Sequence, residues 1–152
     1  MAKQLQLRRG NYLENETFIG AEAEITFDTE RKDIRIHDGV KRGGYKIPTL
    51  VDSQMPTADN GYTWYRLWSD GWVEQGGKFT RMNATNVVIS LPILMASSVY
   101  SIIGTGNAYS NTSGHFAPKS ATTTSFTADI GTDNGNGGWW QVSGISAQGS
   151  KK

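Results

Sequence analysis

The sequence predicts an all-β protein. Short stretches alternate polar and apolar residues with a period of two, as half-buried strands do. The segments between them are rich in glycine, asparagine and serine, and no ten-residue stretch has a good 3.6-residue apolar period. A chain of 152 residues is near the usual size of one domain, and two very small modules in tandem also fit.

The charged residues favour two modules. Residues 1–50 hold nine Lys/Arg and eight Asp/Glu, whereas the remaining 102 residues hold six of each. Residues 49–61 contain proline at position 56, several turn formers and no clear period, which is typical of a connector. We therefore expect an N-terminal module at 1–48 and a C-terminal module at 62–152.

In the first module, polar and apolar residues alternate over 4–8, 23–27 and 33–37, which predicts three strands. Residues 28–32 provide a turn between the second and the third strand. Residues 11–18 leave two alternatives open, a single short helical turn or a loop.

In the second module, Asp70-Gly71 between two aromatic runs predicts a hairpin of strands at 62–68 and 72–75. Further strand candidates lie at 86–91, 99–105, 125–130 and 139–143, and residues 93–100 are candidates for a bend that covers the sheets. This pattern predicts an antiparallel β-sandwich.

The composition excludes some functions and some ways of stabilising a small module. There is no cysteine, so neither a disulfide nor a thiolate zinc site can stabilise a small module, which leaves oligomerisation as the support. The formal net charge of +1 gives no reason to expect nucleic acid or an anionic membrane as partner. No secretion signal or membrane span is visible, and the lack of cysteine suits synthesis in a reducing cytoplasm.

The first module resembles a known family. The elements Gln6-Leu7-Arg8-Arg9-Gly10, Thr17 to Thr29, Ile36-His37-Asp38-Gly39-Val40 and Gly43-Gly44-Tyr45 are similar to the N-terminal domain of phage major tropism determinants and related tail fibres. The resemblance covers residues 3 to 47. It implies a small β-prism-like module in which three chains assemble about one axis. The C-type lectin domain of that family has no room in this chain, so its receptor residues are not carried over.

The second module has a resemblance of its own. The run from Trp64 to Gly77, with Trp-Ser-Asp-Gly-Trp at its centre, and the closing Trp139 to Gly144 look like the C-terminal tip domain of short phage tail fibres. Such tips are trimeric β-sandwiches that recognise cell-surface saccharide or protein. The resemblance implies a trimeric receptor-binding tip here, with an unidentified receptor.

A carbohydrate site needs flat aromatic faces for the apolar sides of a sugar and planar amides for its hydroxyl groups. The sequence offers both kinds of group in two loop regions. Our candidate ligand-binding residues are Trp139, Trp140, Asn107, Tyr109, Asn111 and His115. Adjacent strand residues face opposite sides of a sheet, so we expect at least one of the two tryptophans to pack inside.

Other residues favour structural roles. Trp64 and Trp68 share one face of a strand, which is more typical of a core or subunit contact than of a ligand platform. Three copies of His37 or of His115 about a three-fold axis would be needed for a metal site, which we do not expect. A glycosidase needs two carboxyl groups that converge on one bond. The nearest candidates in the second module are Asp70, Glu74, Asp129 and Asp133, and none sits in a recognisable catalytic motif.

These observations and resemblances predict a homotrimeric phage tail-fibre protein, made in the host cytoplasm and located in the virion tail. We expect it to bind a host polysaccharide, lipopolysaccharide or other outer-membrane component and to contact other tail or baseplate proteins. We expect no cofactor, no nucleic acid, no membrane insertion and no enzymatic activity. Two alternatives remain: a purely structural virion component, and an enzyme that degrades envelope polysaccharide.

Overall fold

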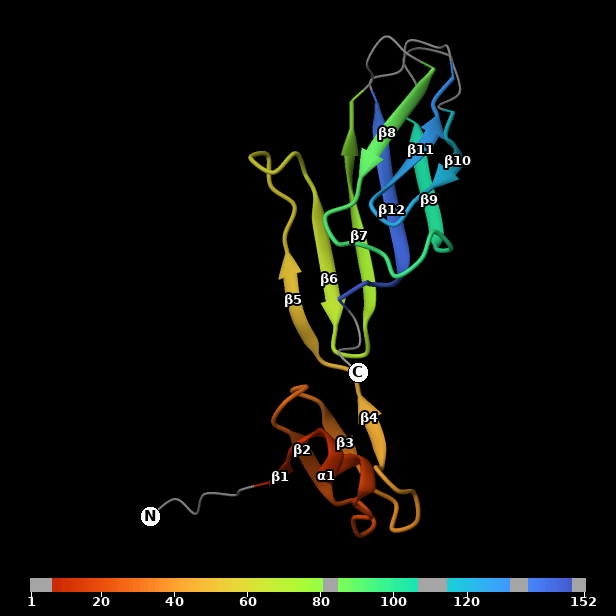
Figure 1. Ribbon diagram of the computed structural model, residues 1–152. Coiled ribbons are helices and arrows are strands. Elements are labelled where there is room, and N and C mark those ends of the chain that lie inside the picture. The colour runs from red at the N-terminus through yellow and green to blue at the C-terminus, as the bar shows by residue number, and fades with distance from the viewer. Residues whose placement is uncertain (1–6, 81–84, 107–114, 132–136, 149–152) are drawn as a thin grey trace. The chain divides into compact units, whose positions relative to one another are not determined.

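The computed structural model describes residues 7–80, 85–106, 115–131 and 137–148. The chain divides into two compact units, residues 1–51 and 52–152 (Figure 1). Within the described ranges, no helix is both long enough and apolar enough to cross a membrane. Nearly all regular structure is β, as the sequence predicts.

The first unit contains one four-stranded sheet and one short helix (Figure 1). The strand order is β1-β2-β3-β4, with β1 (Arg8–Gly10) parallel to β2 (Ile25–Asp28), followed by antiparallel β3 (Ile34–Ile36) and β4 (Tyr45–Ile47). Helix α1 (Tyr12–Thr17) resolves the alternative left open for residues 11–18. Asn11 and Glu14 form a capping box at its N-terminus, which stabilises so short a helix.

The pattern of burial on the two faces of this sheet is the inverse of that in an ordinary small domain. Thr26, Asp28 and Arg35 are buried on one face, and His37 is buried just beyond β3. The opposite face, which we call the apolar face, carries two cross-strand rows: Ile25, Ile36, Tyr45 and Phe27, Ile34, Ile47. Four of these six side chains (Ile25, Ile36, Tyr45 and Ile47) are 38–51% exposed. The described part of the first unit thus buries polar groups and presents apolar ones.

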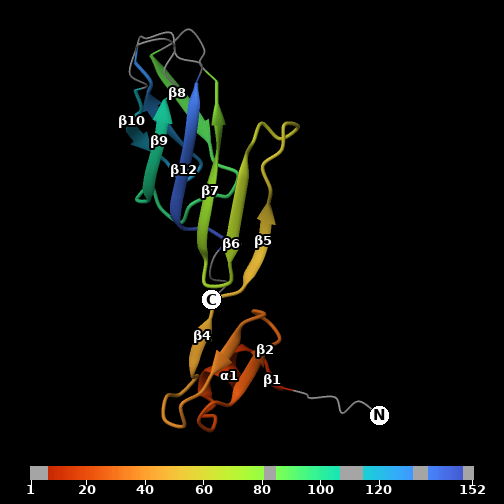
Figure 2. The ribbon, with the colours of Figure 1, turned by 180° about the vertical axis from the view of Figure 1, so that it is seen from behind.

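The second unit is a sandwich of two sheets. The five-stranded sheet has the order β5-β6-β7-β12-β9, which Figure 2 shows from its outer side. Its strands are β5 (Leu50–Gln54), β6 (Trp64–Trp68), β7 (Trp72–Phe79), β12 (Gly138–Ile145) and β9 (Ser101–Gly106). The three-stranded sheet, toward the viewer in Figure 1, contains β10 (Ala117–Ala121), β11 (Ser125–Asp129) and β8 (Asn86–Ser90).

The hydrophobic core lies between these two sheets. It includes Val73 and Val142 from the five-stranded sheet and Phe126 and Ala128 from the three-stranded sheet, each at most 1% exposed. Every residue of the buried hydrophobic cluster belongs to the second unit. The second unit therefore has a core of its own.

Several elements depart from the expectations. Strands β4 and β10 were not predicted, and β5 lies within residues 49–61, where the composition indicates a connector. Proline is tolerated in β10 because that strand is at the edge of its sheet and its register shifts between Pro118 and Ser120. The predicted first strand, 4–8, lies partly outside the described residues, and β1 covers Arg8–Gly10.

Candidate functional site

The outer face of the five-stranded sheet is rich in aromatic residues. We use this name for the side turned away from the three-stranded sheet. Strand registry places Trp64, Gly76, Gln141 and Ile103 in one row across β6, β7, β12 and β9. The next row contains Lys78, Trp139 and Thr105. Because paired residues of antiparallel strands share a face, these side chains gather on one surface.

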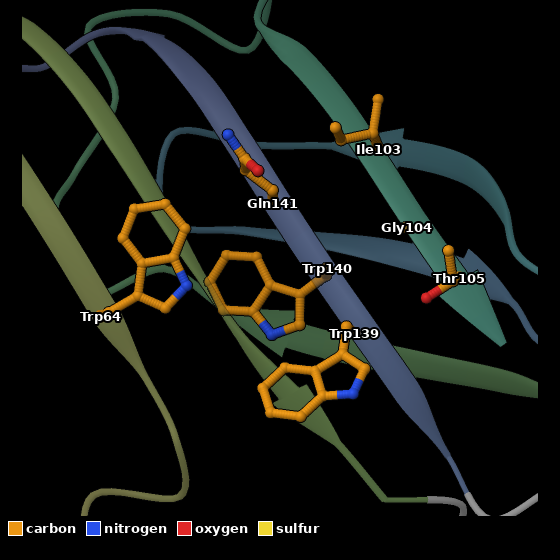
Figure 3. A pocket seen from close by; sticks show the side chains of 7 residues that line it. All are labelled: Trp64, Ile103, Gly104, Thr105, Trp139, Trp140 and Gln141. Carbon is orange, nitrogen blue, oxygen red and sulfur yellow. The ribbon is translucent and has the colours of Figure 1, made fainter. Parts of the chain in front are cut away.

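A groove with a volume of about 290 Å³ runs across this face. Figure 3 shows its lining side chains, which come from three strands of the sheet. The lining residues are Trp64, Ile103, Gly104, Thr105, Trp139, Trp140 and Gln141. The groove therefore combines indole surface with one amide and one hydroxyl group.

The two adjacent tryptophans divide between surface and core. Trp139 is 43% exposed, and its ring makes an edge contact with Tyr62 at 5.8 Å between centroids. Trp140 is 5% exposed and packs edge-on against Phe126, also at 5.8 Å. The expectation that one of the pair packs inside is confirmed, and ligand contact by Trp139 stays a prediction.

Glycine at position 76 leaves room for the ring of Trp64 in the groove. A Cβ atom at Gly76 would lie 2.7 Å from Nε1 of Trp64 and 2.7 Å from the carbonyl oxygen of Trp140. The indole of Trp64 therefore occupies the space that any larger residue at position 76 would need. Glycine at this position lets the aromatic ring lie close against the sheet.

His115 lies away from the groove, in a polar cluster beside β10 and β11. Its Nε2 atom is 3.8 Å from Oδ1 of Asp129, and Nζ of Lys119 is 2.9 Å from Oδ2 of the same carboxylate. Two hydrogen bonds hold the pKa of Asp129 below its usual range: the larger effect comes from the backbone N–H of Gly131, and the next from the side chain of Lys119. The other predicted ligand residues, Asn107, Tyr109 and Asn111, lie outside the described residues.

Sequence reasoning missed half of the groove. It assigned Trp64 to a core or subunit contact and did not consider Gln141, Ile103 or Thr105. The usable signal is strand alternation: Trp139 and Gln141 are two residues apart on one strand and must share a face. The partners of β12 on β7 and β9 are not visible in the sequence, so the rest of the lining required the sheet registry.

The acidic residues have structural partners. Asp70 accepts a hydrogen bond from the backbone N–H of Trp72 in the β6–β7 turn, and Glu74 lies 4.0 Å from Arg66. Asp133 lies outside the described residues. In the described part of the chain, no three His, Asp or Glu side chains gather as a metal site would require.

The chain is similar to known phage proteins. Residues 5–41 match the family model of the major tropism determinant N-terminal domain. A tail fiber receptor-binding protein of Bordetella phage BPP-1 is 32% identical over 138 residues, which cover 82% of this chain and 35% of the relative. The chain thus spans about a third of the length of this curated relative.

A solved structure of a pyocin fibre shares the fold of part of the chain. A C-terminal part of the R2 pyocin fibre of P. aeruginosa aligns with a TM-score of 0.50 and 18% identity over 63% of this chain and 26% of that chain. A second structure, of an N-truncated R2-type pyocin tail fibre, aligns with a TM-score of 0.49 and 17% identity over 63% of this chain and 39% of that chain. The chain is therefore similar to phage tail-fibre proteins, and its residues 5–41 are similar to the major tropism determinant N-terminal domain.

Proposed function

We propose that this protein is a receptor-binding component of a phage tail that binds a polysaccharide or lipopolysaccharide of the host surface as a homotrimer. In this proposal the first unit assembles the chains, and the second unit binds the receptor. The protein is located in the virion tail, where it contacts other tail or baseplate proteins.

The observation that carries the binding proposal is the aromatic groove. Sugar rings have apolar faces that stack on aromatic side chains, and their hydroxyl groups need hydrogen-bond partners. Trp64 and Trp139 offer indole surface, and Gln141 and Thr105 offer an amide and a hydroxyl. A groove this open contacts only part of a ligand, so affinity per site is low. Three sites on one trimer raise it through avidity.

The inverted burial of the first unit supports self-association. Its apolar face leaves Ile25, Ile36, Tyr45 and Ile47 more than a third exposed, although no larger apolar core exists elsewhere in the described part of this unit. A small module without its own core depends on burial against other chains. The number three comes from the resemblance of this module to a trimeric domain.

The similarity to a tail fiber receptor-binding protein of Bordetella phage BPP-1 also supports receptor binding. The aligned part is 35% of the relative. Catalysis receives less support than binding, because Asp70 is engaged in the turn, Glu74 and Asp129 lie within 4.0 Å of a cation, and none of these three acids lines the groove.

The test compares Trp139→Ala with a matched control. Trp72, on β7 of the same sheet, is 40% exposed, against 43% for Trp139, but it does not line the groove. Each variant and the parent protein are applied to an array of bacterial envelope glycans. We expect Trp139→Ala to weaken binding of retained glycans by about two- to tenfold, since aromatic stacking contributes roughly 0.5–1.5 kcal/mol. Trp72→Ala should leave binding unchanged.

Three results would contradict this proposal. Loss of binding in both variants would place the contact elsewhere on the sheet. A parent protein that retains no glycan would favour the purely structural component, and release of reducing ends from a glycan would favour the enzyme.

A further inference from the structure

One end of the groove carries a positive charge. Lys78 is the direct cross-strand partner of Trp139, so the two side chains leave the outer face next to each other. The Nζ atom of Lys78 is 5.7 Å from the centroid of the Tyr62 ring, and Tyr62 in turn contacts Trp139. Lys78 and Tyr62 thus lie next to the groove at its Trp139 end and make the surface there cationic and aromatic.

This charge is not neutralised by a neighbouring acid. The described part of the second unit has three cationic side chains of lysine or arginine, and two of them lie within 4.0 Å of a carboxylate: Arg66 with Glu74 and Lys119 with Asp129. Lys78 has no carboxylate within that distance among the described residues and contacts an aromatic ring instead. It is exposed and available to a ligand.

The remaining charges of this face do not offset Lys78. Strand registry places Arg66, Glu74 and Lys78 on the outer face of β6 and β7, while its described residues on β9 and β12 are uncharged. Glu74 faces Arg66 directly across the strands. Among its described residues, the face therefore has one uncompensated positive charge, located beside the most exposed indole of the groove.

We propose that the groove selects saccharides that carry a carboxylate or a phosphate group, with Lys78 as the residue that contacts the anion and determines this specificity. The proposal rests on the function proposed above and adds the charge class of its ligand. The sugar ring lies against Trp139 and Trp64, and its anionic substituent meets the ammonium group of Lys78. An ammonium ion is a compact point charge that binds either anion, so the geometry does not favour one over the other.

The test separates the anion from the sugar. Acidic bacterial glycans are arrayed next to their own carboxyl-reduced forms, and phosphorylated glycans next to their phosphatase-treated forms. We expect the parent protein to bind the anionic member of a pair about tenfold more tightly at low salt. This ratio should fall as salt rises, because ions screen an exposed charge pair over about 10 Å at 0.1 M ionic strength.

Lys78→Gln is the decisive variant, and Lys119→Gln is its control, since Lys119 is paired with Asp129 away from the groove. Lys78→Gln should bind both members of each pair with the affinity that the parent shows for the neutral member. Lys119→Gln should keep the preference for the anion. The two kinds of pair reveal whether the anion is a carboxylate or a phosphate.

Each remaining outcome is decisive. Equal binding of both members by the parent protein overturns the charge preference and leaves the proposed receptor binding intact. A preference that persists in Lys78→Gln overturns the role of Lys78. Absence of any glycan binding overturns this inference together with the proposed function.

Discussion

Among single residues, Arg35 has the most demanding environment in the first unit. Its side chain is fully buried, and its guanidinium donates to the carbonyl oxygen of Gly43 at 3.0 Å and to the carboxylate of Glu16 at 2.9 Å. A weaker contact of 3.5 Å joins it to the fully buried carboxylate of Asp28. A buried ion pair adds little net stability, but removal of one partner leaves the other charge unpaired.

Arg35→Met should therefore destabilise the first unit by about 3–5 kcal/mol, since Asp28 keeps a buried charge without its counter-ion. Arg42→Met is the control, because Arg42 is an exposed arginine of the same unit. Circular dichroism during denaturant unfolding of the full chain, at one fixed protein concentration, measures the difference. Equal stability of the two variants would mean that Asp28 is satisfied without Arg35.

Among the elements, the connection between β8 and β9 has no regular structure yet is firmly attached. Ile93 and Met95 of this connection are buried in the core. The side-chain amide of Gln75 on β7, itself fully buried, donates to the carbonyl oxygen of Ile93 and accepts from its N–H, both at 2.9 Å. One buried side chain thus satisfies both backbone groups of Ile93, while the backbone N–H groups of Met95 and Ala96 donate to other segments.

Gln75→Met keeps the length of the side chain and removes both hydrogen bonds. It should lower the free energy of unfolding by about 2 kcal/mol or more, because each buried backbone group left unpaired costs roughly 1–3 kcal/mol. Gln148→Met, at an exposed position of the same unit, should change it by less than about 0.5 kcal/mol. Urea titration followed by tryptophan fluorescence measures both, and a Gln75 variant as stable as the parent would show that the connection needs no clamp.

At the scale of the whole molecule, the two units have opposite interiors. The second unit encloses aromatic and aliphatic side chains between its sheets. The first unit encloses the polar side chains of Asn15, Asp28, Arg35 and His37 and exposes its apolar face. This contrast is what we expect if the first unit completes its core only by association with further copies.

The native mass of the chain in dilute solution should be near 50 kDa, three times 16.6 kDa. Ile36→Lys places a charge at the centre of the apolar face and should shift the mass toward that of a single chain, whereas Val40→Lys, at an exposed position beyond β3, should not. Light scattering or native mass spectrometry measures this. A parent protein that remains at 16.6 kDa would remove the argument for a trimer.

Alternation in the sequence predicted most strands, because a period of two is visible in a single chain. It identified which residues share a face but not which face is buried. For 25–28 and 34–36, the ordinary expectation would bury isoleucine, and the structure buries Thr26 and Arg35 instead. Which face of the sheet is buried depends on the helix and loops that pack against it, and their position is a property of the fold.

Short elements were predicted less well. Strand β4 has only three residues, Tyr45-Lys46-Ile47, which is too short for a period of two to be recognised. The groove was half predicted: the split between Trp139 and Trp140 followed from the strand period, whereas Trp64 required knowledge that Gly76 leaves room for its indole. Contacts between distant strands depend on registry, which one sequence does not reveal.

The alternation of β12 also bears on how such a protein diversifies. Trp140 and Val142 are held by the core, whereas Trp139 and Gln141, which alternate with them along the strand, are not. Substitutions at the outward positions change the chemistry of the groove without repacking the sandwich, so they carry little cost in stability. Evolution can therefore vary every second residue of β12 and change the chemistry of the groove while the fold stays the same.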